Sequence, residues 1–213
     1  MDLITEEQAQ QYYDNNDSAH SFEHVKRVVA IARRIAEAEG ADIRIVQTAA
    51  LLHDIGRAEQ SRTGVCHAEV GARRAREILQ GYPVEFVEAV VHAIVTHRYR
   101  DKQNIPQSLE AKVLFDADKL DALGAIGVGR AYAMAGQRGQ KLWSPLHTAV
   151  ADDLSSAIAG QPEDHTPVQE YLFKLRYLRE TMFTATGRRL AADRHAFMVS
   201  FFERLDREVY GLL

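Results

Sequence analysis

The segment Ala50-Leu-Leu-His-Asp-Ile-Gly56 places a histidine and an aspartate at the end of an apolar helix. His53 follows Val46 and Ala49 at helical spacing, so we expect its side chain to point inward with them. Asp42 is suited to cap the start of this helix, and the glycine marks its end. Ionisable side chains that point into a protein interior are costly unless they are partnered. This segment is therefore the first place to look for a functional site.

The same 3.6-residue spacing of apolar residues continues on both sides of this segment, and no stretch shows the sustained alternation that is typical of strands. The sequence therefore predicts an all-α fold with a core of about six helices. These helices are marked by capping residues, prolines or apolar stripes at Thr5, Val25, Asp42, His67, Pro83 and Ser108.

The second part of the chain predicts a helical extension. Residues 124–139 hold five glycines, which favours close helix contact followed by a flexible connection. We place the core at residues 1–135 and the extension at residues 136–213, packed together as a single structural unit. A capping box at Thr166 and Gln169 opens a leucine stripe in the extension, and we expect the buried face of the last helix to comprise Phe197, Phe201, Leu205 and Val209.

The composition excludes several classes of protein. The chain has 213 residues, 46% of them hydrophobic, which is typical of a folded globular protein. The net charge of −4 argues against a protein that coats a nucleic acid polymer. The single cysteine, Cys66, excludes an intramolecular disulfide framework. The N-terminal residues lack the pattern of a signal peptide, and no apolar run could cross a membrane, so we expect a cytoplasmic protein.

The chemistry-bearing residues of the predicted core are His24, the pair His53-Asp54, and Asp118. They come from three expected helices, each at or beside an apolar face. Two imidazoles and two carboxylates form a nitrogen and oxygen set that suits a divalent transition ion with open positions for water and substrate. Periodicity alone leaves two interpretations open, because inward histidines and aspartates can also be hydrogen-bonded core residues.

The order His24, His53-Asp54, Asp118 resembles the signature of the HD-domain metal-dependent phosphohydrolase superfamily. The segments His24-Val-Lys-Arg-Val and Asp116-Ala-Asp-Lys-Leu-Asp-Ala-Leu-Gly-Ala-Ile-Gly127 are similar to its bacterial YpgQ/YedJ-type subgroup, and the resemblance covers about residues 17–135. The resemblance implies an all-α HD core. It also implies one divalent ion held by these four residues, with manganese favoured over nickel or magnesium and with a second metal possible.

The resemblance implies an enzyme in which a metal-activated water attacks phosphorus, with Asp54 orienting that water. The substrate is expected to be a small phosphorylated molecule, and for this subgroup a (deoxy)nucleoside triphosphate that is cleaved to the monophosphate and pyrophosphate. Three alternatives stay open: a nucleoside monophosphatase, a phosphodiesterase with a second metal, and a nucleotide-sensing HD module without turnover. The sequence does not indicate an oligomeric state.

His67 and His97 fall where two-metal relatives carry extra histidines, so they are candidates for a second metal site. The interpretation that we favour from the sequence is contact with substrate phosphate, or proton transfer. Among the basic residues near the motifs, Arg27, Arg98 and Lys119 are candidate phosphate contacts, although most such charges are solvated. Two acidic residues are candidates for a general acid or base, with helix-end capping as the alternative: Glu59 and Asp121.

Overall fold

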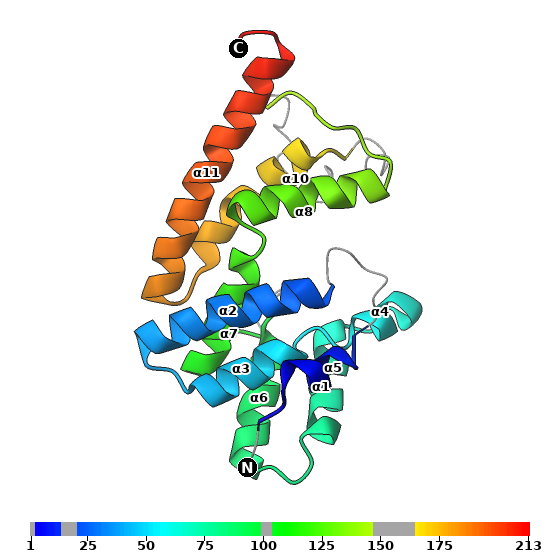
Figure 1. Ribbon diagram of the computed structural model, residues 1–213, viewed down its shortest axis with the longest axis vertical. Helices are drawn as coiled ribbons and strands as arrows, with labels where there is room; N and C mark the ends of the chain where they lie inside the picture. Colours follow the sequence, from blue (N-terminus) through cyan, green and yellow to red (C-terminus); the bar gives the residue numbers. More distant parts are fainter. Residues whose placement is uncertain (1–2, 14–20, 99–103, 147–164) are drawn as a thin grey trace. The chain divides into compact units, whose positions relative to one another are not determined.

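The computed structural model describes residues 3–13, 21–98, 104–146 and 165–213, and these residues form helices and turns without a strand (Figure 1). The all-α prediction is confirmed. Across the described residues, no helix combines the length and the apolar character that a membrane span needs. The described helices are α1 (Glu6–Gln10), α2 (Phe22–Glu39), α3 (Ile43–Leu52), α4 (Arg57–Thr63), α5 (His67–Ile78), α6 (Val84–Thr96), α7 (Leu109–Leu120), α8 (Gly124–Gln137), α10 (Pro167–Phe173), the 3-10 helix η2 (Leu175–Thr181) and α11 (Ala185–Val209).

The chain forms two compact units. The first comprises Met1–Lys119 with Met182–Gly187, and the second comprises Leu120–Thr181 with Arg188–Leu213. The boundary that we expected at residue 135 falls inside α8 and stays a prediction.

Helix α3 lies at the centre of the first unit, where it packs against α1, α2 and α6, while α5 packs against α4 and α6 (Figure 1). Six of its residues are buried, including Leu51 and Leu52. Full burial of each leucine stabilises the fold by about 1.5–3 kcal/mol. The last turn of α3 is buried, and so are the two residues that directly follow it, His53 and Asp54.

The expected helix caps are present. Thr5 and Gln8 form a capping box at α1, and the Asp42 carboxylate accepts a hydrogen bond from the main-chain nitrogen of Arg44 at the start of α3. Gly40 ends α2 with a left-handed φ of 77°, a conformation that glycine adopts without strain. The structure adds one helix that the sequence did not predict, α4. It buries no residue, so it carries no apolar stripe for a pattern to detect.

In the second unit the glycine-rich stretch is helical through Gln137, and a connection follows from Arg138. One expectation for this unit is corrected. The buried face of α11 comprises Ala191, Met198 and Phe202, whereas Phe197 and Val209 are 48% and 46% exposed. The Phe202 ring stacks on Tyr171 of α10 at 4.3 Å between centroids. Met198 and Phe202 share one helical face, and the contact of Phe202 with Tyr171 buries that face. The buried face of α11 is therefore shifted by about one residue from the stripe that we expected.

A candidate metal centre in the first unit

Four of the candidate residues lie on three segments of the first unit. His24 lies in the first turn of α2, His53 and Asp54 directly follow α3, and Asp118 lies in the last turn of α7. The two histidines and Asp54 are buried, and the side chain of Asp118 is 13% exposed. The structure therefore brings together the residues that the sequence singled out.

The first cluster consists of His24, His53 and Asp118. The Nε2 atoms of the two histidines are 3.3 Å apart, and Oδ1 of Asp118 lies 3.4 Å from Nε2 of His24 and 4.0 Å from Nε2 of His53. The Nδ1 atom of His53 lies 2.8 Å from the carbonyl oxygen of Ala50. A carbonyl can only accept, so Nδ1 carries the hydrogen and the lone pair of Nε2 faces the cluster. These three ligand atoms could hold a metal ion.

The second cluster consists of Asp54, His67 and His97, all buried. Oδ1 of Asp54 lies 3.2 Å from Nε2 of His67 and 3.6 Å from Nε2 of His97, and the two Nε2 atoms are 3.1 Å apart. Nδ1 of His97 donates to the carbonyl oxygen of Ile94 at 2.6 Å. Both histidines that sequence analysis assigned to substrate therefore face a carboxylate oxygen, in a group that could also hold a metal ion.

Asp54 lies between the two clusters. Its Oδ2 atom is 3.7 Å from Nε2 of His24 and 3.6 Å from Nε2 of His53, while Oδ1 faces the second cluster and accepts a hydrogen bond from Nε of Arg57 at 2.9 Å. Oδ2 is buried, and none of the described residues gives it a hydrogen bond. A buried polar oxygen without a partner costs about 1–3 kcal/mol, and more if it is charged. A cation between Oδ2 and the imidazole lone pairs would remove that cost, so the donor set fits a divalent transition ion.

The electrostatics keep these groups in the protonation states that metal ligands need. Burial, opposed by Asp54 and assisted by His97, lowers the pKa of His53 to about 4. Burial and His97 lower the pKa of His67 to about 2. Burial alone would raise the pKa of Asp54, but His53, His97 and Arg57 hold it well below its ordinary value. Neutral imidazoles and ionised carboxylates are the forms that coordinate metals.

Asp118 is held by a neighbouring cation. Burial would raise its pKa, but Lys119 and His24 hold the pKa of this carboxyl well below its ordinary value. Nζ of Lys119 donates to Oδ2 of Asp118 at 2.6 Å and to the carbonyl oxygen of His97 at 3.1 Å. One ammonium group therefore contacts a residue of each cluster, and it leaves Oδ1 of Asp118 facing the histidines.

The other predicted site residues are placed as follows. Arg98 follows His97, and its Nη1 lies 3.1 Å from Oε1 of Gln60. Arg27 is half-buried on α2, one turn after the candidate ligand on that helix. The carboxylate of Glu59 accepts a hydrogen bond from Arg73 of α5 at 2.8 Å, and the structure does not bring it into either cluster. Asp121 belongs to the second unit, where Nη1 of Arg130 donates to its Oδ2 at 2.8 Å.

Two polar residues of this region were missed by sequence reasoning as parts of the site or its support, Gln60 and Asp116, while Arg57 was noted only as one of several basic residues near the motifs. Asp116 is buried, and its carboxylate accepts hydrogen bonds from the main-chain nitrogens of Phe183 and Thr184, each at 2.8 Å. It therefore fixes the segment before α11 to α7, two residues from Asp118. The aspartate-rich motif was visible, but no sequence signal separates an aspartate that clamps the chain from one that faces the cluster.

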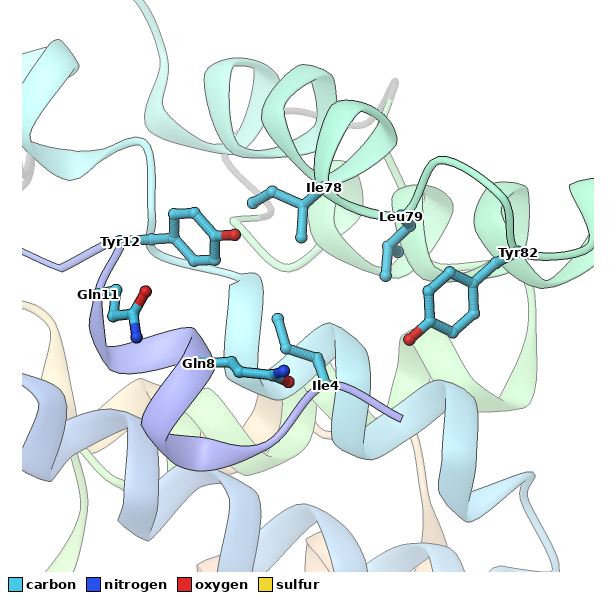
Figure 2. A pocket seen from close by; sticks show the side chains of 7 residues that line it. All are labelled: Ile4, Gln8, Gln11, Tyr12, Ile78, Leu79 and Tyr82. Carbon is cyan, nitrogen blue, oxygen red and sulfur yellow. The ribbon is translucent and has the colours of Figure 1, made fainter. Parts of the chain in front are cut away.

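Two cavities of the first unit lie beside the helices that build the site. One of about 260 Å³ is lined by Gln60, Cys66 and Arg98 among others, next to the second cluster. The other, of about 320 Å³, lies between α1 and the turn that joins α5 to α6, where side chains such as Gln8 and Tyr12 face Ile78 and Tyr82 (Figure 2). No residue of either cluster lines the second cavity.

Comparisons with known proteins give a consistent result. The HD domain family model matches residues 21–123. The uncharacterized protein YpgQ of Bacillus subtilis is 32% identical over 201 residues, which are 93% of this chain and 88% of that protein. The crystal structure of Bacillus subtilis YpgQ in complex with ADP matches with a TM-score of 0.71 and 30% identity, covering 95% of this chain and 92% of that chain. A predicted HD superfamily hydrolase from an uncultured Thermotogales bacterium matches with a TM-score of 0.64 and 33% identity, covering 95% and 88%.

Proposed function

Because the chain belongs to the HD superfamily of metal-dependent phosphohydrolases, we propose that it is a nucleotide pyrophosphohydrolase that cleaves (deoxy)nucleoside triphosphates to the monophosphate and pyrophosphate. The observation that carries this proposal is the buried Asp54 carboxylate, which faces imidazole nitrogens of both clusters and whose Oδ2 receives no hydrogen bond from any residue that the structure describes. The crystallised complex of YpgQ with ADP supports a nucleotide as the ligand class. The single cysteine, Cys66, fits a cytoplasmic site of action.

In this proposal, one divalent ion is held by His24, His53, Asp54 and Asp118. Asp54 also contributes to a second ion, with the two remaining histidines of its cluster. Manganese is the favoured metal, and nickel or magnesium are alternatives, because a mixed nitrogen and oxygen set accepts all three. A divalent ion bound there supplies a water of lowered pKa and offsets the negative charge that develops on phosphoryl oxygens.

The residues of the chain have separate tasks in this proposal. Asp54 accepts a hydrogen bond from the attacking water and orients it, while the Nε of Arg57 keeps that carboxylate ionised and fixed. Arg27, Arg98 and Lys119 supply positive charge toward the phosphates of the substrate. The general acid that protonates the leaving group stays a prediction, with Glu59 and Asp121 as candidates.

The test is product analysis. Purified protein is incubated with manganese, magnesium or nickel and with a panel of nucleoside mono- and triphosphates. The wild type is compared with Asp54→Asn and with a matched control, Asp193→Asn, whose side chain is exposed on α11. Pyrophosphate that is released by the wild type and the control, but not by Asp54→Asn, supports the proposal. Orthophosphate alone identifies a phosphatase. No product, with metal and ADP binding retained, identifies a nucleotide-sensing module.

The second cluster favours one further candidate function, a phosphodiesterase. Paired metal ions stabilise both the attacking and the leaving oxygen of an in-line displacement, which is the chemistry of phosphodiester hydrolysis. His67 and His97 provide the nitrogen ligands that a second ion requires. Adding a phosphodiester such as bis(p-nitrophenyl) phosphate and a cyclic nucleotide to the same panel separates this activity from the release of pyrophosphate.

A further inference from the structure

His67 is oriented differently from His53 and His97 of the candidate metal centre. His53 and His97 each donate Nδ1–H to the main-chain carbonyl three residues earlier in the chain. Nδ1 of His67 instead lies 2.5 Å from Oε1 of Gln60, a side chain of α4. The orientation of this imidazole therefore depends on a side chain of another helix, which a substitution can remove.

The contacts of Gln60 identify the atom that faces His67. Its Oε1 lies 3.1 Å from the main-chain nitrogen of His67 and 3.1 Å from Nη1 of Arg98. Both groups are donors whatever the tautomer of the imidazole, so the shared atom is the amide oxygen. Nδ1 of His67 also lies 3.2 Å from Nη1 of Arg98, but the shorter contact of 2.5 Å with an acceptor oxygen requires a hydrogen between the two atoms. Nδ1 of His67 therefore carries its hydrogen and donates it to Gln60. The lone pair of Nε2 then faces Oδ1 of Asp54 at 3.2 Å and Nε2 of His97 at 3.1 Å.

Gln60 also replaces a missing helix cap. His67 is the first residue of α5, and the preceding Cys66 makes no side-chain hydrogen bond to that helix end. The amide oxygen of Gln60 accepts from the main-chain nitrogen of His67 and so satisfies one of the free donors at this terminus. One side chain thus fixes both the backbone and the ring of His67.

We propose that Gln60 is the positioning residue that sets the affinity of the second ion. This inference rests on the proposed two-ion centre, and it adds to that centre a residue that affects the binding of only one of the two ions. Partners of ligating histidines typically change metal affinity by about 10- to 100-fold when they are removed. The Gln60 side chain contacts His67 of the second cluster and Arg98 beside it, and among the described residues it has no hydrogen bond to His24, His53 or Asp118, so its loss should weaken the second ion and leave the first unchanged.

The experiment compares Gln60→Ala, Gln60→Glu and a control on the same helix, Ser61→Ala, whose exposed hydroxyl donates to a main-chain carbonyl of α4. Circular dichroism and thermal unfolding of the metal-free proteins show whether each variant folds. Manganese alone is then titrated and followed by calorimetry and by electron paramagnetic resonance, which separates single from paired ions. In the metal-free protein, nitrogen-15 correlations of labelled histidine report the tautomer of His67, whose signal is assigned with His67→Gln.

We expect two manganese ions in the wild type and in Ser61→Ala. Gln60→Ala should bind the second ion about 10- to 100-fold more weakly and lose the fixed tautomer of His67, whereas Gln60→Glu should restore both because a carboxylate accepts the same three donors. If Gln60→Ala binds the second ion with unchanged affinity, the proposed role of Gln60 is wrong, but the two-ion centre is not affected. An equal loss of both ions, not restored by Gln60→Glu, also overturns it. A wild type that binds one ion overturns the two-ion centre itself, and this inference with it.

Discussion

Gly56 packs so closely against His67 that a β-carbon at residue 56 would collide with the main-chain carbonyl oxygen of His67. It would also lie 2.9 Å from the main-chain nitrogen of Gly71. Gly56 has a φ of −84°, which any residue can adopt, so the requirement for glycine is one of space. This contact holds the turn after Asp54 against the start of α5, and it is what allows a carboxylate from one segment to meet an imidazole from the other.

Gly56→Ala is expected to destabilise the protein by about 1–3 kcal/mol, because the added methyl group forces the backbone of α5 away. It should also weaken metal binding by moving His67 from Asp54. The matched control is Gly129→Ala in α8, where nothing lies within 4 Å of the added carbon. There the substitution should stabilise the helix by about 0.5–1 kcal/mol. Urea unfolding and manganese titration measure both effects, and equal behaviour of the two variants would contradict the steric argument.

The stability of the metal-free protein should fall between pH 6.5 and pH 5.5. The pKa of His53 is lowered from 6.5 to about 4, and that of His67 to about 2. In this interval the unfolded chain therefore binds a proton on each histidine that the folded protein does not. The stabilisation is complete above pH 6.5 and is lost as the pH falls, by up to about 1.4 kcal/mol per pH unit for each histidine.

Urea unfolding across this pH range measures the loss. His53→Gln should reduce the slope with pH, since it removes one of the two groups. The lowered pKa values of Asp54 and Asp118 act only below about pH 5, where the unfolded carboxylates begin to bind protons. A stability that is constant from pH 7.5 to pH 5.5 would contradict buried, neutral histidines.

Manganese should stabilise the wild-type protein against unfolding, because a ligand that binds only the folded state at 100 times its Kd contributes about 2.7 kcal/mol. Asp54→Asn should abolish most of this effect, since Asp54 faces both clusters, whereas Asp193→Asn should retain it. Thermal unfolding with manganese and with a chelator measures the difference. A manganese-dependent shift of the same size in Asp54→Asn would argue against a metal at this site.

The sequence predicted most helices of the first unit because their apolar stripes and caps are local. The capping box at Thr5 and the aspartate cap of α3 were both found where expected. Helix α4 could not be predicted, since it buries no residue and its contacts with α5 are made by the polar side chains of Glu59 and Gln60. On α11, a stripe of large side chains was visible in the sequence, but stacking with Tyr171 buries Phe202 and leaves Phe197 exposed. A partner from another helix cannot be identified from the local sequence pattern.

The candidate site was predicted to a similar degree. The order of His24, His53-Asp54 and Asp118 led to residues that the structure brings within a few ångströms of one another. Metal binding by them stays a prediction. Gln60 could not have been found, because a single amide on a polar segment has no periodicity, and its role depends on a hydrogen bond across seven residues.

Asp116 and Asp118 of α7 should give opposite results when each is changed to asparagine. Asp116 accepts hydrogen bonds from the main chain of Phe183 and Thr184 and, at 2.7 Å, from the hydroxyl of Thr184. An asparagine would turn one acceptor into a donor that faces other donors, so Asp116→Asn should cost at least about 2 kcal/mol of stability. Its metal stoichiometry should be unchanged wherever the protein stays folded.

Asp118→Asn should instead lose affinity for the first ion, and without metal it should cost less stability than Asp116→Asn, because the amide oxygen of asparagine can still accept the hydrogen bond from Lys119. Urea unfolding with a chelator and manganese titration, applied to both variants, make the comparison. If Asp116→Asn lost metal and Asp118→Asn lost stability, the two aspartates would have exchanged roles, and the first cluster would have to be rebuilt around Asp116.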